Sequence, residues 1–164
     1  MLAPIGAPGG EVWNTRKDGL AHAGCCILLP AEAFLRMAVL LINDGVWDGE
    51  RLLPEGFVEQ VRTPTPQNQH AGMGAYIGQP YVERRGAASP VRFPGLGTYH
   101  SEPYVADDLF LYDGNSNQVA YIVPSAELII LRTGTAPPKE PEWDNAYLPN
   151  LVLRAMDSAN VAAR

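Results

Sequence analysis

The side chains that could act as nucleophiles in this sequence are five serines and two adjacent cysteines. No serine has a lysine three residues later, so the Ser-x-x-Lys arrangement, in which an amine takes the hydroxyl proton, is not present. The sequence also has no Gly-x-Ser-x-Gly turn, phosphate-binding glycine loop, His-Glu-x-x-His pair or cysteines at metal-ligand spacing. The five serines are Ser89, Ser101, Ser116, Ser125 and Ser158, and the two cysteines are Cys25 and Cys26. Motifs alone therefore identify no catalytic centre, and we expect no cofactor and no metal.

Histidines, aspartates and tryptophans are the other residues of types that are common in sites. His22, His70 and His100 are dispersed over loop-like segments, where surface or packing roles are commoner than a metal or triad role. Asp107 and Asp108 could bind a cation, but a solvated start of a strand is the more common situation. The tryptophans, which more often anchor cores or loops than form ligand cages, are Trp13, Trp47 and Trp143.

Length and charge limit the classes of protein to consider. A chain of 164 residues that is 46% hydrophobic can form one domain with a sizeable core. Its net charge of −6 gives no basic surface for nucleic acid or for an anionic membrane. No run approaches the roughly 18 apolar residues of a membrane span, and no secretion signal is visible. We therefore expect neither a nucleic-acid partner nor a membrane span, and the compartment stays open.

The segment from Asp107 to Thr133 organises the predicted fold, because it reads as three strands. The runs 109–112, 118–123 and 128–131 are apolar and are separated by clusters of turn-forming residues. Both connections are too short for a helical crossover, so neighbouring strands should be antiparallel. Consecutive apolar residues in the last strand predict that both of its faces are covered. Such a sheet requires helices on both sides.

Three helices are predicted around this sheet. The strongest runs from Pro30 to Asn43 and is apolar around most of its circumference, so it should be mostly buried. A shorter helix is expected from Pro54 to Arg62, and a last one from Asn145 to Asp157, capped by Asp144. The fold class is therefore α+β, an antiparallel sheet flanked by helices.

Two segments are rich in glycine and proline and have little periodicity. They are residues 1–24 and the long segment 63–103. Loops of this length in a compact domain are either functional or missing something on which to pack. We interpret residues 1–164 as a single, partial domain that contains the long loop 63–103.

Three segments, in the same order along the chain, resemble the C-terminal half of the serine β-lactamase-like hydrolases. This family includes class C β-lactamases, DD-peptidases, related esterases and 6-aminohexanoate-dimer hydrolases. Residues 2–7 are similar to the family's Pro-Leu-Gly stretch. Residues 24–54 include Arg36 and a Gly-x-Trp-x-Gly-x-x-Leu-Leu sequence, and are the most specific match. Residues 112–133 are similar to the family's Gly-x-x-Gly-Gln segment that ends in Arg-Thr.

The resemblance implies a partial β-lactamase or transpeptidase-like fold that lacks the nucleophile-bearing half. In the family, the serine, its lysine and the Tyr-x-Asn box lie upstream of the segment that begins here at Met1. The strand edge Tyr112, Asp113 and Gly114 would line the substrate groove together with Gln118. The backbone N–H of Asn115 would be the second oxyanion donor. A plain hairpin turn is the alternative for the same residues.

The sequence departs from the family pattern at several positions. Pro30 replaces the usual Ser, Ala33 the usual Asp, and Asn117 a usual Gly. Residues 112–114 replace the Lys-Thr-Gly or His-x-Gly box, and the carboxylate of Asp113 should weaken the binding of an anionic substrate. We therefore expect an ester or small amide substrate rather than a β-lactam.

The predicted function is that of a C-terminal fragment of a serine β-lactamase-like hydrolase acting through an acyl-enzyme. The isolated chain should be inactive because the Ser-x-x-Lys and Tyr-x-Asn boxes are absent. Its partner would be a small ester or amide, once the missing half is supplied. Two alternatives remain open: a non-catalytic binding module, and an assembly subunit that associates with itself or with a partner through exposed apolar surface.

Overall fold

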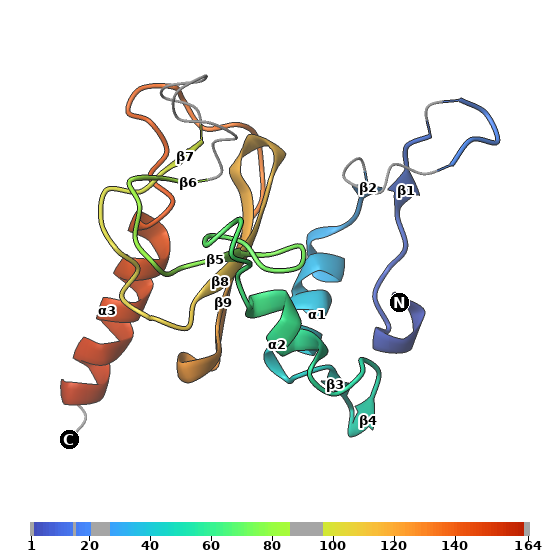
Figure 1. Cartoon of the computed structure of the whole chain (residues 1–164), viewed down its shortest axis with the longest axis horizontal. Helices are drawn as coiled ribbons and strands as arrows, with labels where there is room; N and C mark the ends of the chain where they lie inside the picture. Colours follow the sequence, from blue (N-terminus) through green and yellow to red (C-terminus); the bar gives the residue numbers. More distant parts are fainter. Residues whose placement is uncertain (1, 15, 21–26, 86–96, 163–164) are drawn as a thin grey trace.

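A four-stranded antiparallel sheet lies between helices on both of its faces (Figure 1). The computed structural model describes residues 2–14, 16–20, 27–85 and 97–162. The strands, in their order across the sheet, are β10 (Leu128–Arg132), β9 (Gln118–Val123), β8 (Phe110–Gly114) and β5 (Tyr76–Ile77). The helices are α1 (Ala31–Ile42) and α2 (Phe57–Arg62) on one side and α3 (Tyr147–Ala162) on the other. The α+β class predicted from the sequence is confirmed.

The three predicted strands are confirmed as antiparallel neighbours. Gly114 pairs with Gln118 across the first turn, and Val123 pairs with Leu128 across the second. Residues 119–123 of β9 are all buried, because this strand is central and is covered on both faces. β10 also packs on both faces, but as an edge strand it is only half-buried at every residue. Both faces of β10 are therefore covered as predicted, but β9 is the more deeply buried strand.

Alternate residues of the strands supply two separate cores. One core lies against α3 and includes Leu111, Val119, Tyr121 and Leu153. The other lies against α1 and α2 and includes Ala38, Val61, Phe110 and Ile122. This alternation is the two-residue period of a strand, expressed on both faces of the sheet. Both layers contribute to stability because burial removes apolar surface from water.

Helix α1 begins where the sequence predicts, with Pro30 as its N-cap, but it is less buried than predicted. Phe34 is 36% exposed and Leu35 is 41% exposed. The guanidinium of Arg36 donates a 3.1 Å hydrogen bond to the carbonyl of Ile5, which ties α1 to the short 3-10 helix η1 (Ala3–Ile5). The later turns of α1 pack against the sheet, whereas Phe34 and Leu35 near its start are exposed.

The other two helices start later than predicted. α2 begins at Phe57 rather than at Pro54, because Gly56 at its N-cap has a φ of 76°, which a helix cannot accommodate. α3 begins at Tyr147 rather than at Asn145, so Asn145 lies in the connection before the helix. Asp144 accepts a 3.0 Å hydrogen bond from the N–H of Ala146, before the first helical turn. The predicted cap therefore organises the approach to α3 instead of its first turn.

The long segment 63–103 has more structure than its composition predicts. It contributes β5 to the main sheet and forms a separate two-stranded ladder of β6 (Arg84–Arg85) and β7 (Thr98–Tyr99). Two further short ladders pair β1 (Glu11–Val12) with β2 (Ile27–Leu28), and β3 (Val46–Trp47) with β4 (Glu50–Arg51). His22, Cys25, Cys26 and Ser89 lie outside the described residues. Among the described helices, none has the length and apolar character needed to cross a bilayer.

Candidate functional site

The candidate residues predicted from the sequence lie at the end of β8 and in the turn that follows it. Tyr112, Asp113 and Gly114 are the last residues of β8, Asn115 opens the turn, and Gln118 is paired with Gly114. β8 pairs with β9 along its whole length, but with β5 only at Phe110 and Leu111. Among the described strands, none pairs with the other side of residues 112–114.

Neighbouring side chains of β8 point to opposite faces of the sheet. Tyr112 packs in the core against α1, and its burial raises the pKa of its hydroxyl. Asp113 faces the α3 side, and Gly114, Asn115 and Gln118 are exposed. A β-carbon on Gly114 would lie 3.3 Å from the carbonyl oxygen of Gln118, a close but tolerable contact. The fold alone therefore does not demand a glycine at position 114.

The turn after β8 has an unusual backbone that one arginine holds in place. Ser116 and Asn117 both lie in the left-handed region, with φ of 62° and 56°. Asparagine is among the few residues that adopt this region readily, so Asn117 can serve where a glycine would also fit. Arg132 donates 2.8 Å hydrogen bonds to the carbonyls of both residues and a 3.0 Å bond to the carbonyl of Thr135.

The carboxylate of Asp113 belongs to a polar network between the sheet and the connection to α3. The hydroxyl of Thr98 donates to it at 2.9 Å and the amide of Asn145 at 3.2 Å. The carbonyl oxygen of the Asn145 side chain in turn accepts from the hydroxyl of Tyr121 and, at 3.2 Å, from the indole N–H of Trp143. Asn145 is only 1% exposed, and its side-chain amide and carbonyl both have partners.

Burial governs the protonation of Asp113. Loss of solvent raises the pKa of its carboxyl, and the hydrogen bonds from Thr98 and Asn145 oppose this rise only in part. No cation is among its hydrogen-bond donors within the described residues. Asp113 is therefore a buried acid that neutral donors hold in place.

A second buried group surrounds His100. Its Nδ1 lies 2.9 Å from the carbonyl of Thr98 and its Nε2 lies 3.0 Å from the hydroxyl of Tyr104. Since a carbonyl can only accept, Nδ1 carries the proton and Nε2 accepts from Tyr104. Burial, together with the charge of Arg85, lowers the pKa of His100 to about 4. His100 is therefore neutral at physiological pH and serves as a packing element.

Arg85 is a buried cation that is only 3% exposed. It donates hydrogen bonds to the carbonyls of Ile77, Gly78 and Pro80, and these bonds hold the end of β5 and the segment that follows it. Its charge also contributes to lowering the pKa of His70, after the larger effect of partial burial. Residues of both polar groups meet around a space too small for a water molecule, so they form a packed interior rather than a ligand cavity.

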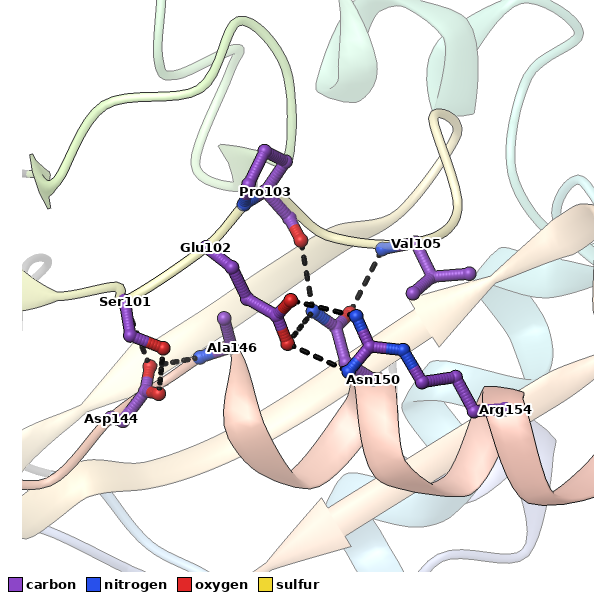
Figure 2. Close-up of polar contacts among 8 residues, drawn as sticks. All are labelled: Ser101, Glu102, Pro103, Val105, Asp144, Ala146, Asn150 and Arg154. Carbon is purple, nitrogen blue, oxygen red and sulfur yellow. Dashed lines mark hydrogen bonds and ion pairs between the residues drawn. The ribbon is translucent and has the colours of Figure 1, made fainter.

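Residues 101–105 are fixed to α3 by a set of hydrogen bonds and an ion pair (Figure 2). The side chain of Asn150 accepts from the N–H of Val105 at 2.8 Å and donates to the carbonyl of Pro103 at 2.8 Å. Glu102 receives two hydrogen bonds from Arg154, at 2.9 and 2.7 Å, and one from Asn150. This attachment positions Thr98 and His100 relative to the sheet.

Three of the four serines in the described part of the chain have hydroxyls that donate to acidic side chains or to the backbone. The hydroxyl of Ser101 donates to Asp144, that of Ser125 to Asp108, and that of Ser158 to the backbone of Arg154. Asp107 and Asp108, for which the sequence favoured a solvated start of a strand over a cation site, accept hydrogen bonds from neutral donors: Asp107 from Gln79, and Asp108 from the N–H and the hydroxyl of Ser125. The described residues also contain no cluster of three or more potential metal ligands.

Several organising residues escaped the sequence reasoning. Thr98, Asn145, Arg85 and Arg132 make the contacts that define the two polar groups and the turn. Only Arg132 had a local signal, because the Arg-Thr pair is part of the family pattern. Thr98 and Arg85 lie in a segment without periodicity, and Asn145 was assigned to the start of a helix. Asp113, which Thr98 and Asn145 both contact, is 15 and 32 residues away from them in sequence.

Comparison with known proteins gives no family assignment. No protein-family model matches the sequence, and no curated protein matches it significantly. What the chain can do is therefore inferred from its residues, their geometry and the resemblance of the three segments.

Proposed function

We propose that this chain forms the substrate-binding wall of a serine hydrolase of the β-lactamase-like type, acting on an ester or a small amide. The carrying observation is the edge of β8 at residues 112–114, which has no strand partner among the described strands and leads into Asn115. Arg132 fixes the carbonyls of the next two residues. A fixed backbone N–H at the end of an open strand edge is suited to stabilise an oxyanion.

The layered arrangement also supports this proposal. The β-lactamase-like fold places an antiparallel sheet between helices, and the present sheet has helices on both faces in a compatible chain order. The nucleophile must come from a segment other than this chain, since the Ser-x-x-Lys and Tyr-x-Asn boxes are absent. An uncharged substrate fits better than an anionic one, because Asp113 would repel a carboxylate once ionised.

The first test uses the isolated chain and a fluorophosphonate probe, read by intact-protein mass spectrometry. We expect no adduct and no turnover of an activated ester. A stable adduct on any of the five serines would contradict the absence of a nucleophile. The DNA preceding the Met1 codon is read in parallel, and we expect an in-frame stretch encoding the two missing boxes. A stop codon and a ribosome-binding site there would overturn the hydrolase proposal.

The second test addresses Asn115 in the form that carries the nucleophile segment. Asn115→Pro removes the backbone N–H, and Gly114, with ψ of −178°, is extended as a residue before proline must be. Loss of one oxyanion donor should lower kcat by roughly 10²–10³-fold. Asn115→Ala keeps the N–H and should leave kcat nearly unchanged. Equal effects of the two changes would show that the N–H has no catalytic role.

An assembly subunit is the second candidate, favoured by apolar surface at the N-terminal ladder and α1. Val12 and Ile27 are paired across this ladder and are 46% and 49% exposed. Phe34 and Leu35 on α1 are also exposed. This candidate predicts oligomers in size-exclusion chromatography with light scattering, dissociated by Leu35→Glu. A monomer at all concentrations would contradict self-association.

A further inference from the structure

A concave region, separate from the edge of β8, lies where β10 ends and α3 begins. It has a volume of about 650 Å³ and is open to solvent; small-molecule sites typically have volumes of roughly 300–1,000 Å³. Its walls include Arg132, Pro137, Pro138, Pro141, Trp143 and Tyr147. We call it the Trp143 groove. Five of its ten lining residues carry aromatic or pyrrolidine rings.

The Trp143 groove has a fixed wall. The indole N–H of Trp143 is bonded to Asn145 at 3.2 Å, and the guanidinium carbon of Arg132 lies 4.9 Å from the centre of the indole ring. Arg132 is itself held by three backbone carbonyls. A ring held on its edge and on one face loses little freedom when a ligand contacts it, which favours affinity.

The charges around the Trp143 groove are already paired within the chain. Glu142 forms two hydrogen bonds with Arg84, at 2.9 and 2.7 Å. Asp144 accepts from Ser101 and from the N–H of Ala146, and Arg132 donates to three backbone carbonyls. Two guanidinium groups and two carboxylates sum to no net charge. A charged ligand would therefore compete with existing bonds, whereas an uncharged one would not.

The remaining accessible surface is apolar and aromatic. Tyr147, at the first position of α3, is 64% exposed and is one of the residues that line the groove. Together with the fixed indole of Trp143, this residue gives the groove aromatic surface that a ligand can contact. Stacking and apolar contact are the interactions that this surface offers.

We propose that the Trp143 groove binds an uncharged, predominantly apolar small molecule that contains an aromatic ring. Tyr147 and Trp143 would contact the ring, and the prolines would contact the apolar remainder. This site does not depend on the hydrolase proposal, because its residues are separate from residues 112–115 and need no nucleophile.

The probe for the test is N-phenyl-1-naphthylamine, an uncharged aromatic dye whose emission rises in apolar surroundings. We expect saturable binding at one site, with a shift of the indole N–H signal of Trp143 in NMR spectra, assigned through Trp143→Phe. Tyr147→Ala should weaken binding at least tenfold, and Tyr147→Phe should retain it. Since Tyr147 is largely exposed, both variants should fold, which the urea midpoint checks.

The matched control is Leu35→Ala, which removes an exposed apolar side chain from α1. It should leave dye affinity unchanged. Unchanged affinity in Tyr147→Ala, or loss of affinity in Leu35→Ala, would overturn the proposal and place the dye on the other apolar surface. Binding that does not saturate, or an unmoved Trp143 signal, would overturn it as well. None of these readouts depends on hydrolysis, so this proposal and the hydrolase proposal can fail separately.

Discussion

Asp113 and Asn145 lie 32 residues apart in the sequence, and the amide of Asn145 donates a 3.2 Å hydrogen bond to the carboxylate of Asp113. This bond joins the end of β8 to the connection that leads into α3. Asn145 also accepts from Trp143 and Tyr121, so one amide links the open strand edge, the core and the wall of the Trp143 groove. Both proposed sites are therefore positioned by the same buried side chain.

The first prediction concerns the pH dependence of stability through Asp113. Its native pKa is raised by burial, so the native state binds the proton more tightly than the unfolded chain does. This group therefore makes the free energy of unfolding fall as pH rises from the unfolded-state pKa of 3.8 through the native pKa. Asp113→Asn removes this effect and keeps an oxygen that can accept from Thr98 and Asn145. We expect it to be at least as stable as the wild type at pH 7, with a smaller advantage at pH 4.

Urea denaturation at several pH values measures this effect, with exposed Glu55→Gln as the control. Asp113→Ala leaves two buried donors without an acceptor and should cost about 1–3 kcal/mol. If Asp113→Asn were as damaging at pH 7 as Asp113→Ala, the carboxylate would be stabilising, and the assigned direction of its pKa would be wrong.

The strands were predictable because their signals are local. The apolar runs 109–112, 118–123 and 128–131 and the turns between them are contiguous in sequence, and their antiparallel pairing followed from connection length. The contacts of Asp113 were not predictable, because Thr98 and Asn145 come from segments whose position depends on the whole fold. The starts of α2 and α3 were missed because backbone geometry at Gly56 and the buried role of Asn145 override the proline and cap signals.

Helix α1 shows a different limit of sequence reasoning. Its composition predicts burial around most of the helix, and Ala33 and Leu40, on the side away from the sheet, are buried. Phe34 and Leu35, near the start of the helix, are exposed although their residue types favour the interior. The second candidate function, an assembly subunit, would place a partner over these exposed apolar side chains.

The second prediction concerns His100. Its native pKa of about 4 is below the unfolded value of 6.5, so the native state binds the proton less tightly. The stability that depends on neutral His100 is complete above pH 6.5 and declines as pH falls from 6.5 towards 4, by an amount on the order of 2 kcal/mol. An NMR titration of the ring protons should show no midpoint above pH 5. A midpoint near 6.5 would mean that His100 is solvated and that its bond to Tyr104 is not maintained.

The third prediction compares two residues of α3 that both contact Glu102. Asn150 is fully buried and satisfies the N–H of Val105 and the carbonyl of Pro103 (Figure 2). Asn150→Ala leaves both groups unpaired and should lower the free energy of unfolding by about 3 kcal/mol. Arg154→Ala removes only a solvent-exposed ion pair and should have little effect, because water screens such pairs. Thermal denaturation of the two variants measures the difference, and similar losses would contradict the dominance of the buried amide.

The fourth prediction concerns the hydrogen bonds that Arg132 donates to the turn at Ser116 and Asn117. The donors of a lysine all lie on one nitrogen, whereas those of arginine are spread over a planar group. Arg132→Lys therefore cannot reproduce the three hydrogen bonds to carbonyls or the stacking on Trp143. We expect a loss of about 1–3 kcal/mol in the free energy of unfolding and faster amide hydrogen exchange at residues 115–118.

The matched control for Arg132→Lys is Arg51→Lys. The Arg51 guanidinium also donates to two backbone carbonyls, those of Asp44 and Leu53, but its side chain is 41% exposed and lies in the separate β3–β4 hairpin. Its replacement should cost less and leave exchange at residues 115–118 unchanged. If both variants accelerated exchange there equally, the change would reflect global loosening. If Arg132→Lys did not change the exchange rate at residues 115–118, the left-handed residues would hold the turn without the arginine. The position of the backbone N–H of Asn115 would then depend on the strand alone.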